Sequence, residues 1–122
     1  MIPPKIEYIW IPKVLVTIEK ETHHAILDLG SSASILSKEL YEILELKNLE
    51  KCSIELELAD DSIKNALVKV IDVVVELYMT FGPAYFLIMD IGNKTSSPII
   101  LGRPFLRTTG AIIDSKEGNV KF

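Results

Sequence analysis

The chain has 122 residues, 48% of them hydrophobic and 25% charged, which is typical of a single globular domain with a packed core. Its net charge of −4, with Lys and Arg scattered along the sequence, argues against nucleic-acid binding. No apolar stretch reaches the roughly 20 residues that a membrane helix needs. The single Cys52 cannot form an internal disulfide and no zinc pattern is present, so we expect no metal, no cofactor and a cytoplasmic protein.

The first part of the chain predicts an arm, a hairpin and a helix. Prolines at positions 3, 4 and 12 favour an extended arm over residues 1–12, because proline cannot donate to a sheet ladder. Residues 14–19 are rich in β-branched side chains, and a polar stretch at 20–24 separates them from the apolar run 25–27, which together predict a hairpin. Ser37 is a good N-cap, so a helix is expected from 38 to about 46, with Leu40, Ile43 and Leu44 on its apolar face.

The middle of the chain predicts a long hairpin and a bend. Residues 54–58 alternate strictly between apolar and acidic, and a second run returns over 63–70. The tip between them, Ala59, Asp60, Asp61 and Ser62, has the composition of a turn. The alternation slips at 71–72 and restarts at 73–77, which indicates a bulge or a bend between two strands. Gly82-Pro83 predicts a turn before a buried strand at 84–89.

Near the C-terminus, the apolar run 99–101 leads into Gly102. Pro104 suits the first turn of a helix and Gly110 suits its C-cap, so one short helix is expected between them. Residues 111–122 form a terminal hairpin. The total is about eight to ten short strands and two short helices without strand–helix–strand alternation, which predicts a small, mostly antiparallel, closed or sandwich-like β fold.

Asp28 is the main candidate for chemistry. It follows a buried strand, where an ionised carboxylate is costly unless it is hydrogen-bonded or shares a proton, and Gly30 permits a sharp turn beside it. Hydrolysis of a peptide bond by carboxylates needs two of them, one to take a proton from water and one to protonate the carbonyl oxygen. Asp114 follows an apolar run but precedes a turn without that glycine. Asp90 is followed by Ile91-Gly92, but then by a loop rather than a hydroxyl-rich turn and helix. The simplest second acid is therefore Asp28 of a second copy across a two-fold axis.

Two other readings of the polar residues are weaker. One alternative is that a serine of the cluster Ser31, Ser32 and Ser34 acts as a nucleophile. A serine nucleophile needs a nearby base, and the two histidines, His23 and His24, fall in the polar stretch before the strand. Hydrogen bonds to the Asp28 loop are enough to explain the serines. Adjacent histidines on a strand point to opposite faces, which disfavours a shared metal.

The strand order, together with Ala25-Ile26-Leu27-Asp28-Leu29-Gly30 and Ile100-Leu101-Gly102-Arg103, resembles the retropepsin family of aspartic proteases, over residues 13–122. The likeness is closest to the protease region of plant gypsy-type retrotransposon polyproteins. It implies a small closed antiparallel β barrel and an obligate homodimer that binds a polypeptide substrate. Asp28 would be the catalytic carboxylate, Leu29, Gly30 and Ser31 its loop, Ala59 to Ser62 the flap, and the chain termini part of the dimer contact.

The sequence also departs from the family pattern. Leu29 stands where the family usually has Thr or Ser, whose hydroxyl hydrogen-bonds across the dimer axis. Ser32 replaces an acid that pairs with the arginine matching Arg103, and the expected flap has no glycine.

Three hypotheses follow. The first is an aspartic endopeptidase that processes a retrotransposon polyprotein, in the cytoplasm or within retroelement particles. The second is a catalytically impaired retropepsin-like module for dimerisation or peptide binding, which Leu29 motivates. The third is an unrelated small β domain in which Asp28 merely ends a strand.

Overall fold

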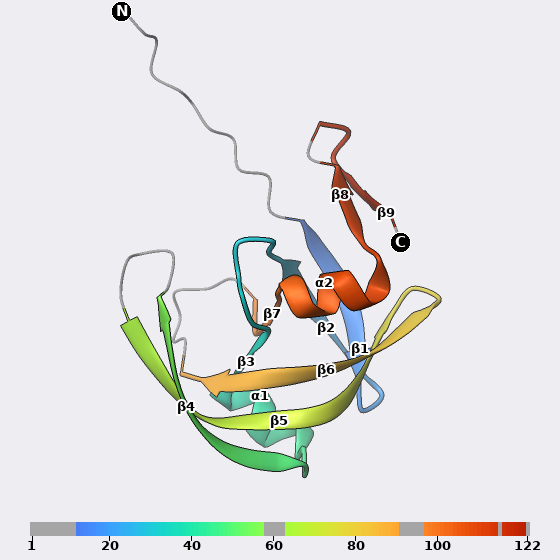
Figure 1. Cartoon of the computed structure of the whole chain (residues 1–122). Helices are drawn as coiled ribbons and strands as arrows, with labels where there is room; N and C mark the ends of the chain where they lie inside the picture. Colours follow the sequence, from blue (N-terminus) through green and yellow to red (C-terminus); the bar gives the residue numbers. More distant parts are fainter. Residues whose placement is uncertain (1–11, 58–62, 91–96, 115, 122) are drawn as a thin grey trace, which may run out of the picture.

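The computed structural model describes residues 12–57, 63–90, 97–114 and 116–121. Within them lie nine strands and two helices (Figure 1). In chain order they are β1 Lys13–Ile18, β2 Glu21–Leu27, β3 Ile35–Ser37, α1 Lys38–Leu44, β4 Leu49–Glu57, β5 Ile63–Leu77, β6 Thr80–Met89, β7 Ile99–Leu101, α2 Arg103–Thr109, β8 Ile112–Asp114 and β9 Asn119–Lys121.

Six strands close into a barrel. They follow the order β1-β2-β7-β3-β6-β5, and a pairing of Thr17 with Glu76 joins β5 back to β1. β4 extends from β5 outside this ring, and β8 and β9 form a separate hairpin. The predicted mainly β, closed barrel with two short helices is therefore confirmed. The hairpins are antiparallel, whereas β2 with β7 and β3 with β6 pair in parallel.

The barrel is filled by alternate residues of its strands. On β1 the side chains of Val14, Val16 and Ile18 are buried while Leu15, between them, is 55% exposed. A main core joins the barrel to both helices. A smaller apolar cluster lies around β3, β5 and β6; its buried members are Ala33, Ile35, Ala66, Leu87 and Met89.

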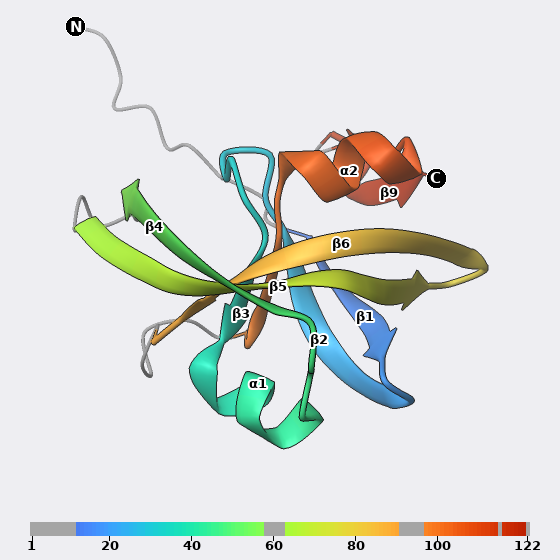
Figure 2. The ribbon, with the colours of Figure 1, turned by 60° about the horizontal axis from the view of Figure 1, so that its bottom comes forward.

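Helix α1 begins where its cap predicts. The Ser37 hydroxyl accepts a hydrogen bond from the Leu40 amide at 3.1 Å. Leu40 and Leu44 are buried, but Ile43 is 64% exposed, so the expected apolar face is narrower than predicted. The helix ends at Leu44 because Glu45 turns left-handed, with φ of 52°. Figure 2 shows α1 below the barrel and α2 on the opposite side.

Two predicted turns lie elsewhere. The β1–β2 turn consists of Glu19 and Lys20, both left-handed, so His23 and His24 belong to β2 rather than to the turn. Gly82-Pro83 lies inside β6; the turn before it is Tyr78-Met79, where Tyr78 has φ of 54°. Pro83 fits a strand here because β3 pairs with β6 only at residues 87–89, which leaves proline an open edge.

The bulge predicted at 71–72 is confirmed. The β5–β6 register shifts between Val70 and Val73, and Asp72 has φ of 56°. β5 nevertheless continues through it as one strand of 15 residues, shared by the barrel and by the β4–β5 hairpin. The tip of that hairpin, Ala59 to Ser62, and the arm before Pro12 lie outside the described residues.

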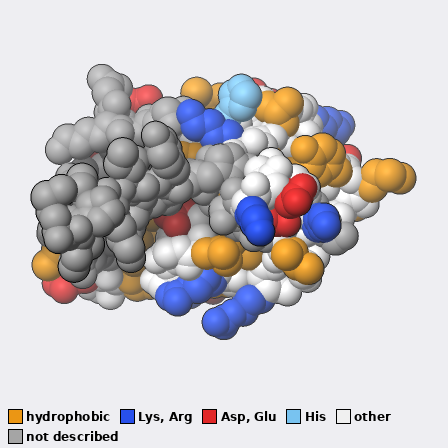
Figure 3. Space-filling model, turned by 90° about the horizontal axis from the view of Figure 1, so that it is seen from above, with side chains coloured by type: hydrophobic (Ala, Val, Ile, Leu, Met, Phe, Trp, Pro, Cys, Tyr) orange, Lys and Arg blue, Asp and Glu red, His pale blue; other side chains and the backbone are white. Residues whose placement is uncertain are grey.

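The C-terminal predictions are confirmed where they can be followed. Pro104 lies in the first turn of α2 and Gly110, with φ of 67°, caps its end. β8 and β9 pair as the terminal hairpin. In the described part of the chain, no helix is long and apolar enough to cross a membrane. Figure 3 shows lysines and arginines spread over the described part of one face rather than gathered in one patch.

Candidate active site

The Asp28 loop, residues 28–34, connects β2 to β3 and crosses the end of β7, which lies between those two strands. Its entry is held by the Asp28 amide, which donates to the Leu101 carbonyl at 2.9 Å. Within the loop the Ser31 amide donates to the Asp28 carbonyl at 3.2 Å. Main-chain hydrogen bonds therefore fix the position of Asp28 on the sheet.

The Asp28 carboxylate is half-buried and folds back over its own loop. Its Oδ1 accepts a hydrogen bond from the Gly30 amide at 2.8 Å. A Cβ at position 30 would lie 3.1 Å from that oxygen, so glycine leaves room for this contact. Among the described residues, no hydrogen bond occupies Oδ2. One carboxylate oxygen is thus oriented by the backbone and the other is available for chemistry.

Gly102 lies directly beneath the loop. A Cβ there would be 2.4 Å from the Ala33 carbonyl oxygen and 2.8 Å from that of Ser31. Only glycine allows the end of β7 to approach the loop this closely. The two sequence motifs, around Asp28 and around Ile100 to Arg103, are therefore brought together in space.

Hydrogen bonds to two serines join the Asp28 loop to the end of β7. Ser34, 2% exposed, accepts a hydrogen bond from the Gly102 amide at 3.1 Å through its hydroxyl. Its carbonyl accepts one from the Leu87 amide at 2.9 Å. Ser31 donates through its hydroxyl to the Ala33 carbonyl, and its own carbonyl accepts from the Arg103 amide at 3.0 Å. The serines thus hydrogen-bond the loop, and the contact from Ser34 to position 102 is one that local sequence cannot reveal.

Neither a serine nucleophile nor a metal finds support in this arrangement. His23 and Asp28 are five residues apart along β2, or about 16 Å in an extended strand. Nε2 of His23 is buried and has no hydrogen-bond partner among the described residues. Within the same described residues, no group of three or more His, Cys, Asp or Glu is placed to hold a metal ion.

Two of the three departures from the family pattern, at Leu29 and at Ser32 with Arg103, lie on the surface. Leu29 is 54% exposed beside Asp28. Ser32 and Arg103 are exposed, and Arg103 makes no ion pair with any residue that the structure describes. The structure thus places Leu29 where a second chain can reach it, while the expected flap residues lie outside the described residues.

Comparisons with known proteins agree with this geometry. The family model described as Aspartyl protease matches residues 14–105. The crystal structure of the retroviral protease-like domain of Ddi1 from Leishmania major superposes with a TM-score of 0.70 at 18% identity, over 92% of this chain and 87% of that one. The EIAV protease complexed with the inhibitor HBY-793 gives 0.68 at 20% identity, over 90% of this chain and 98% of that one. No curated protein matches the chain. The chain therefore belongs to the aspartyl protease family and has the fold of retroviral proteases.

Proposed function

We propose that the protein is an aspartic endopeptidase that works as a homodimer, with one Asp28 from each chain. The observation that carries this is the orientation of the Asp28 carboxylate by the Gly30 amide, on a loop fixed by the Leu101 carbonyl. One chain provides one such acid, so a second copy is the simplest source of the other.

In the dimer the two carboxyl groups share one proton. The ionised group takes a proton from a water molecule that attacks the scissile carbonyl carbon. The protonated group gives its proton to the carbonyl oxygen, which forms a neutral tetrahedral intermediate. The group that took the proton from water then gives it to the peptide nitrogen, the C–N bond breaks and the amine leaves, while the other group takes back a hydroxyl proton as the carbonyl re-forms. The Gly30 amide keeps each carboxylate in one orientation through this exchange.

The proposed substrate is a retrotransposon polyprotein, cleaved in the cytoplasm or inside retroelement particles. The resemblance of the sequence to plant gypsy-type protease regions motivates this substrate. A polyprotein that contains the chain itself would be presented at high local concentration, which suits an enzyme whose dimer is weak.

Cleavage of a polyprotein fragment at mildly acidic pH tests the proposal, with Asp28→Asn as the variant. Asp114→Asn is a matched control, because Asp114 Oδ1 only accepts the amides of Lys116 and Glu117, which an asparagine oxygen also does. We expect Asp28→Asn to be inactive and Asp114→Asn to cleave normally. Equal cleavage by wild type and Asp28→Asn would overturn the assignment.

Mixing tests the sharing of one site by two chains. When dimers exchange freely, an equal amount of Asp28→Asn chain is expected to lower the activity of the wild type to about half, because half-mutant dimers lack one acid. Unchanged activity after mixing would contradict a site built from two chains.

A second candidate function is a dimerisation or peptide-binding module without catalysis. The exposed Leu29 favours it, because leucine cannot make the hydrogen bond that hydroxyl residues make across the axis. This candidate predicts a dimer by sedimentation that binds peptides and does not cleave them at any pH. Pepstatin-sensitive turnover would exclude it.

A further inference from the structure

The outer face of the β5–β6 hairpin is largely apolar and open to solvent. Side chains of the two strands alternate between the barrel core and the outside, so the outward ones form two facing rows. The register pairs Val74 with Pro83 and Glu76 with Phe81, which places the Cβ atoms of each pair about 5 Å apart. Val74 is 59% exposed and Phe81 is 66% exposed. We call this surface the outer ladder; its members are Asp72, Val74, Glu76, Phe81, Pro83 and Tyr85.

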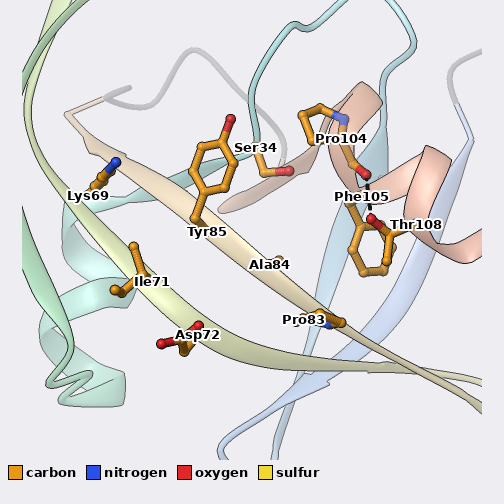
Figure 4. Close-up of a pocket in the computed structure, with 10 residues that line it drawn as sticks. All are labelled: Ser34, Lys69, Ile71, Asp72, Pro83, Ala84, Tyr85, Pro104, Phe105 and Thr108. Atoms are coloured by element: carbon orange, nitrogen blue, oxygen red, sulfur yellow. Dashed lines mark hydrogen bonds between the residues drawn. The ribbon is translucent and has the colours of Figure 1, made fainter.

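The apolar surface continues at both ends of the outer ladder. At the hairpin turn Met79 is 96% exposed, and Figure 2 shows this turn projecting beyond β1. At the other end Pro83 and Tyr85 line a groove of about 400 Å³ that reaches Pro104 and Phe105 of α2 (Figure 4). Contiguous exposed apolar surface of this kind is typical of interaction sites.

The hairpin turn is not built for stability. Tyr78 adopts a left-handed backbone, with φ of 54°, which side chains other than glycine avoid. Glycine, asparagine or aspartate would suit such a turn better than Tyr78-Met79. Apolar residues at a strained and exposed turn point to a role outside the fold.

Two carboxylates lie among these apolar side chains. Asp72 and Glu76 both face outward from β5, about 13 Å apart along the strand. Neither acid forms an ion pair with any residue that the structure describes, because Lys69, which lies 5.9 Å from the centre of the Tyr85 ring, is engaged by Glu50. A second copy of the chain on this surface would bring four acids together across a two-fold axis. The outer ladder therefore favours a different partner, one that is apolar and basic.

The shape of the surface favours a helical partner. The backbones of β5 and β6 are paired with each other here, and α2 flanks the other side of β6, where an added Cβ at Gly82 would lie 3.2 Å from the ring of Phe105. A polypeptide on this face therefore finds no strand edge and must satisfy its own backbone hydrogen bonds. An α-helix does so, and its diameter of about 10 Å matches the width of two adjacent strands.

We propose that the outer ladder is a docking surface for a basic amphipathic helix of another protein. The apolar stripe of the helix covers Val74, Phe81 and Pro83, and lysine or arginine side chains at the border of the stripe reach Asp72 and Glu76. The proposal does not depend on proteolysis, because the outer ladder includes no residue of the Asp28 loop.

Binding of a model helix tests the proposal. The probe is a fluorescent peptide of about 18 residues with leucine at positions i, i+3, i+4 and i+7 and lysine elsewhere; the matched peptide has glutamate in place of lysine. The protein is the full chain with Asp28→Asn, so that the peptide is not cut. We expect saturable binding of the lysine peptide by fluorescence anisotropy, and at least tenfold weaker binding of the glutamate peptide. Equal binding of the two peptides, or no binding of the lysine peptide, overturns the proposal.

Variants test whether the peptide lies on the outer ladder. Phe81→Ser is expected to weaken binding of the lysine peptide about tenfold and Glu76→Gln about threefold, because each removes one contact. Ile63→Ser is the control for the apolar contact, since Ile63 is also 66% exposed and lies at the opposite end of β5. Glu55→Gln, at an exposed position of β4, is the control for the lost charge. Both controls are expected to bind within twofold of the parent; equal losses in controls and ladder variants overturn the proposal.

Oxidation of Met79 provides an independent measurement. Met79 is 96% exposed beside the outer ladder, whereas Met89 is 3% exposed and is the internal reference. We expect saturating lysine peptide to slow the formation of Met79 sulfoxide by hydrogen peroxide at least threefold and to leave Met89 unchanged. Unchanged oxidation of Met79 overturns the proposal. Protection by phosphatidylcholine or anionic vesicles, or by concentrating the protein alone, would also overturn it, in favour of a lipid surface or of a second copy.

Discussion

Gly30 and Gly102 follow the ends of two paired strands, β2 and β7, and meet different demands. An added Cβ at Gly30 would approach one side-chain oxygen, Asp28 Oδ1, at 3.1 Å. An added Cβ at Gly102 would collide with backbone carbonyls, the nearest at 2.4 Å. Side chains can rotate away, whereas the hydrogen-bonded loop above Gly102 cannot move without breaking its contacts.

The difference between Gly30 and Gly102 separates the residues that are expected to matter for catalysis from those that stabilise the loop. The Gly30 side carries the half-buried acid and the exposed Leu29, so changes there are expected to alter activity and association. The Gly102 side is buried and makes the contacts that hold the loop, so changes there are expected to alter stability. Measuring activity and the free energy of unfolding on the same variants tests this division.

Asp28→Asn is expected to give the largest effect. In the proposed homodimer the substitution removes both carboxylates of the pair, so the cleavage rate is expected to fall by more than the roughly 10²- to 10⁴-fold that is typical of losing one general acid or base. The asparagine oxygen can still accept the Gly30 amide, so the free energy of unfolding is expected to change little. A large loss of stability in urea unfolding would show that Asp28 also supports the fold, against the division.

Gly102→Ala is expected to give the next effect, on stability. The backbone clash with Ala33 and Ser31 costs about 3 kcal/mol or more, because both loop carbonyls are held by hydrogen bonds or packing. Gly118→Asn is a suitable control, because Gly118 is open and its φ of 68° is tolerated by asparagine. Nearly equal urea midpoints for the two variants would contradict the tight contact.

Ser34→Ala is expected to destabilise the protein by about 1–3 kcal/mol, because the buried Gly102 amide loses its acceptor. Ser34→Thr keeps the hydroxyl and is expected to restore most of the loss. If alanine and threonine cost the same in thermal unfolding, the hydrogen bond is not the reason for serine here.

Leu29→Thr is expected to tighten the proposed dimer. Each hydrogen bond regained across the axis contributes about 0.5–1.5 kcal/mol, or about two- to tenfold in the dimer dissociation constant. Sedimentation equilibrium measures that constant, with unfolding of the dilute monomer as the control for the fold. A weaker dimer would indicate that leucine makes a better contact there than a hydroxyl.

Ile43→Ser is expected to give the smallest effect. Ile43 is 64% exposed on α1, so its loss is expected to change the free energy of unfolding by less than about 0.5 kcal/mol. Leu40→Ser, at a 4% exposed position of the same helix, is the comparison and is expected to cost several times more.

Local signals predicted the local features. Ser37 capped its helix, Gly110 ended the second one, and the broken alternation at 71–72 located the bulge. The turn at Tyr78-Met79 was missed because Tyr78 adopts a left-handed backbone that tyrosine rarely takes, while Gly82-Pro83 is a stronger turn signal.

Contacts between residues that are far apart in the chain could not be predicted from local sequence patterns. The parallel pairings of β2 with β7 and of β3 with β6 join segments far apart in the chain. The hydrogen bond between Ser34 and Gly102 joins residues that are 68 positions apart, and no local sequence pattern at either residue predicts it. The Asp28 motif could be recognised because its residues are adjacent in the sequence, whereas the residues that hold its loop in place, Leu101 and Gly102, are far away in the chain.

The position of β7 between β2 and β3 has a consequence for biosynthesis. β7 pairs with both β2 and β3, and its Leu101 carbonyl accepts the Asp28 amide. The ribosome makes this strand roughly seventy residues after Asp28, about half the length of an ordinary domain. A ribosome-bound chain that stops before Ile99 lacks the Leu101 carbonyl that accepts the Asp28 amide and the Gly102 amide that donates to the Ser34 hydroxyl. The loop that carries Asp28 therefore gains its full support only after residues 99–102 have left the ribosome.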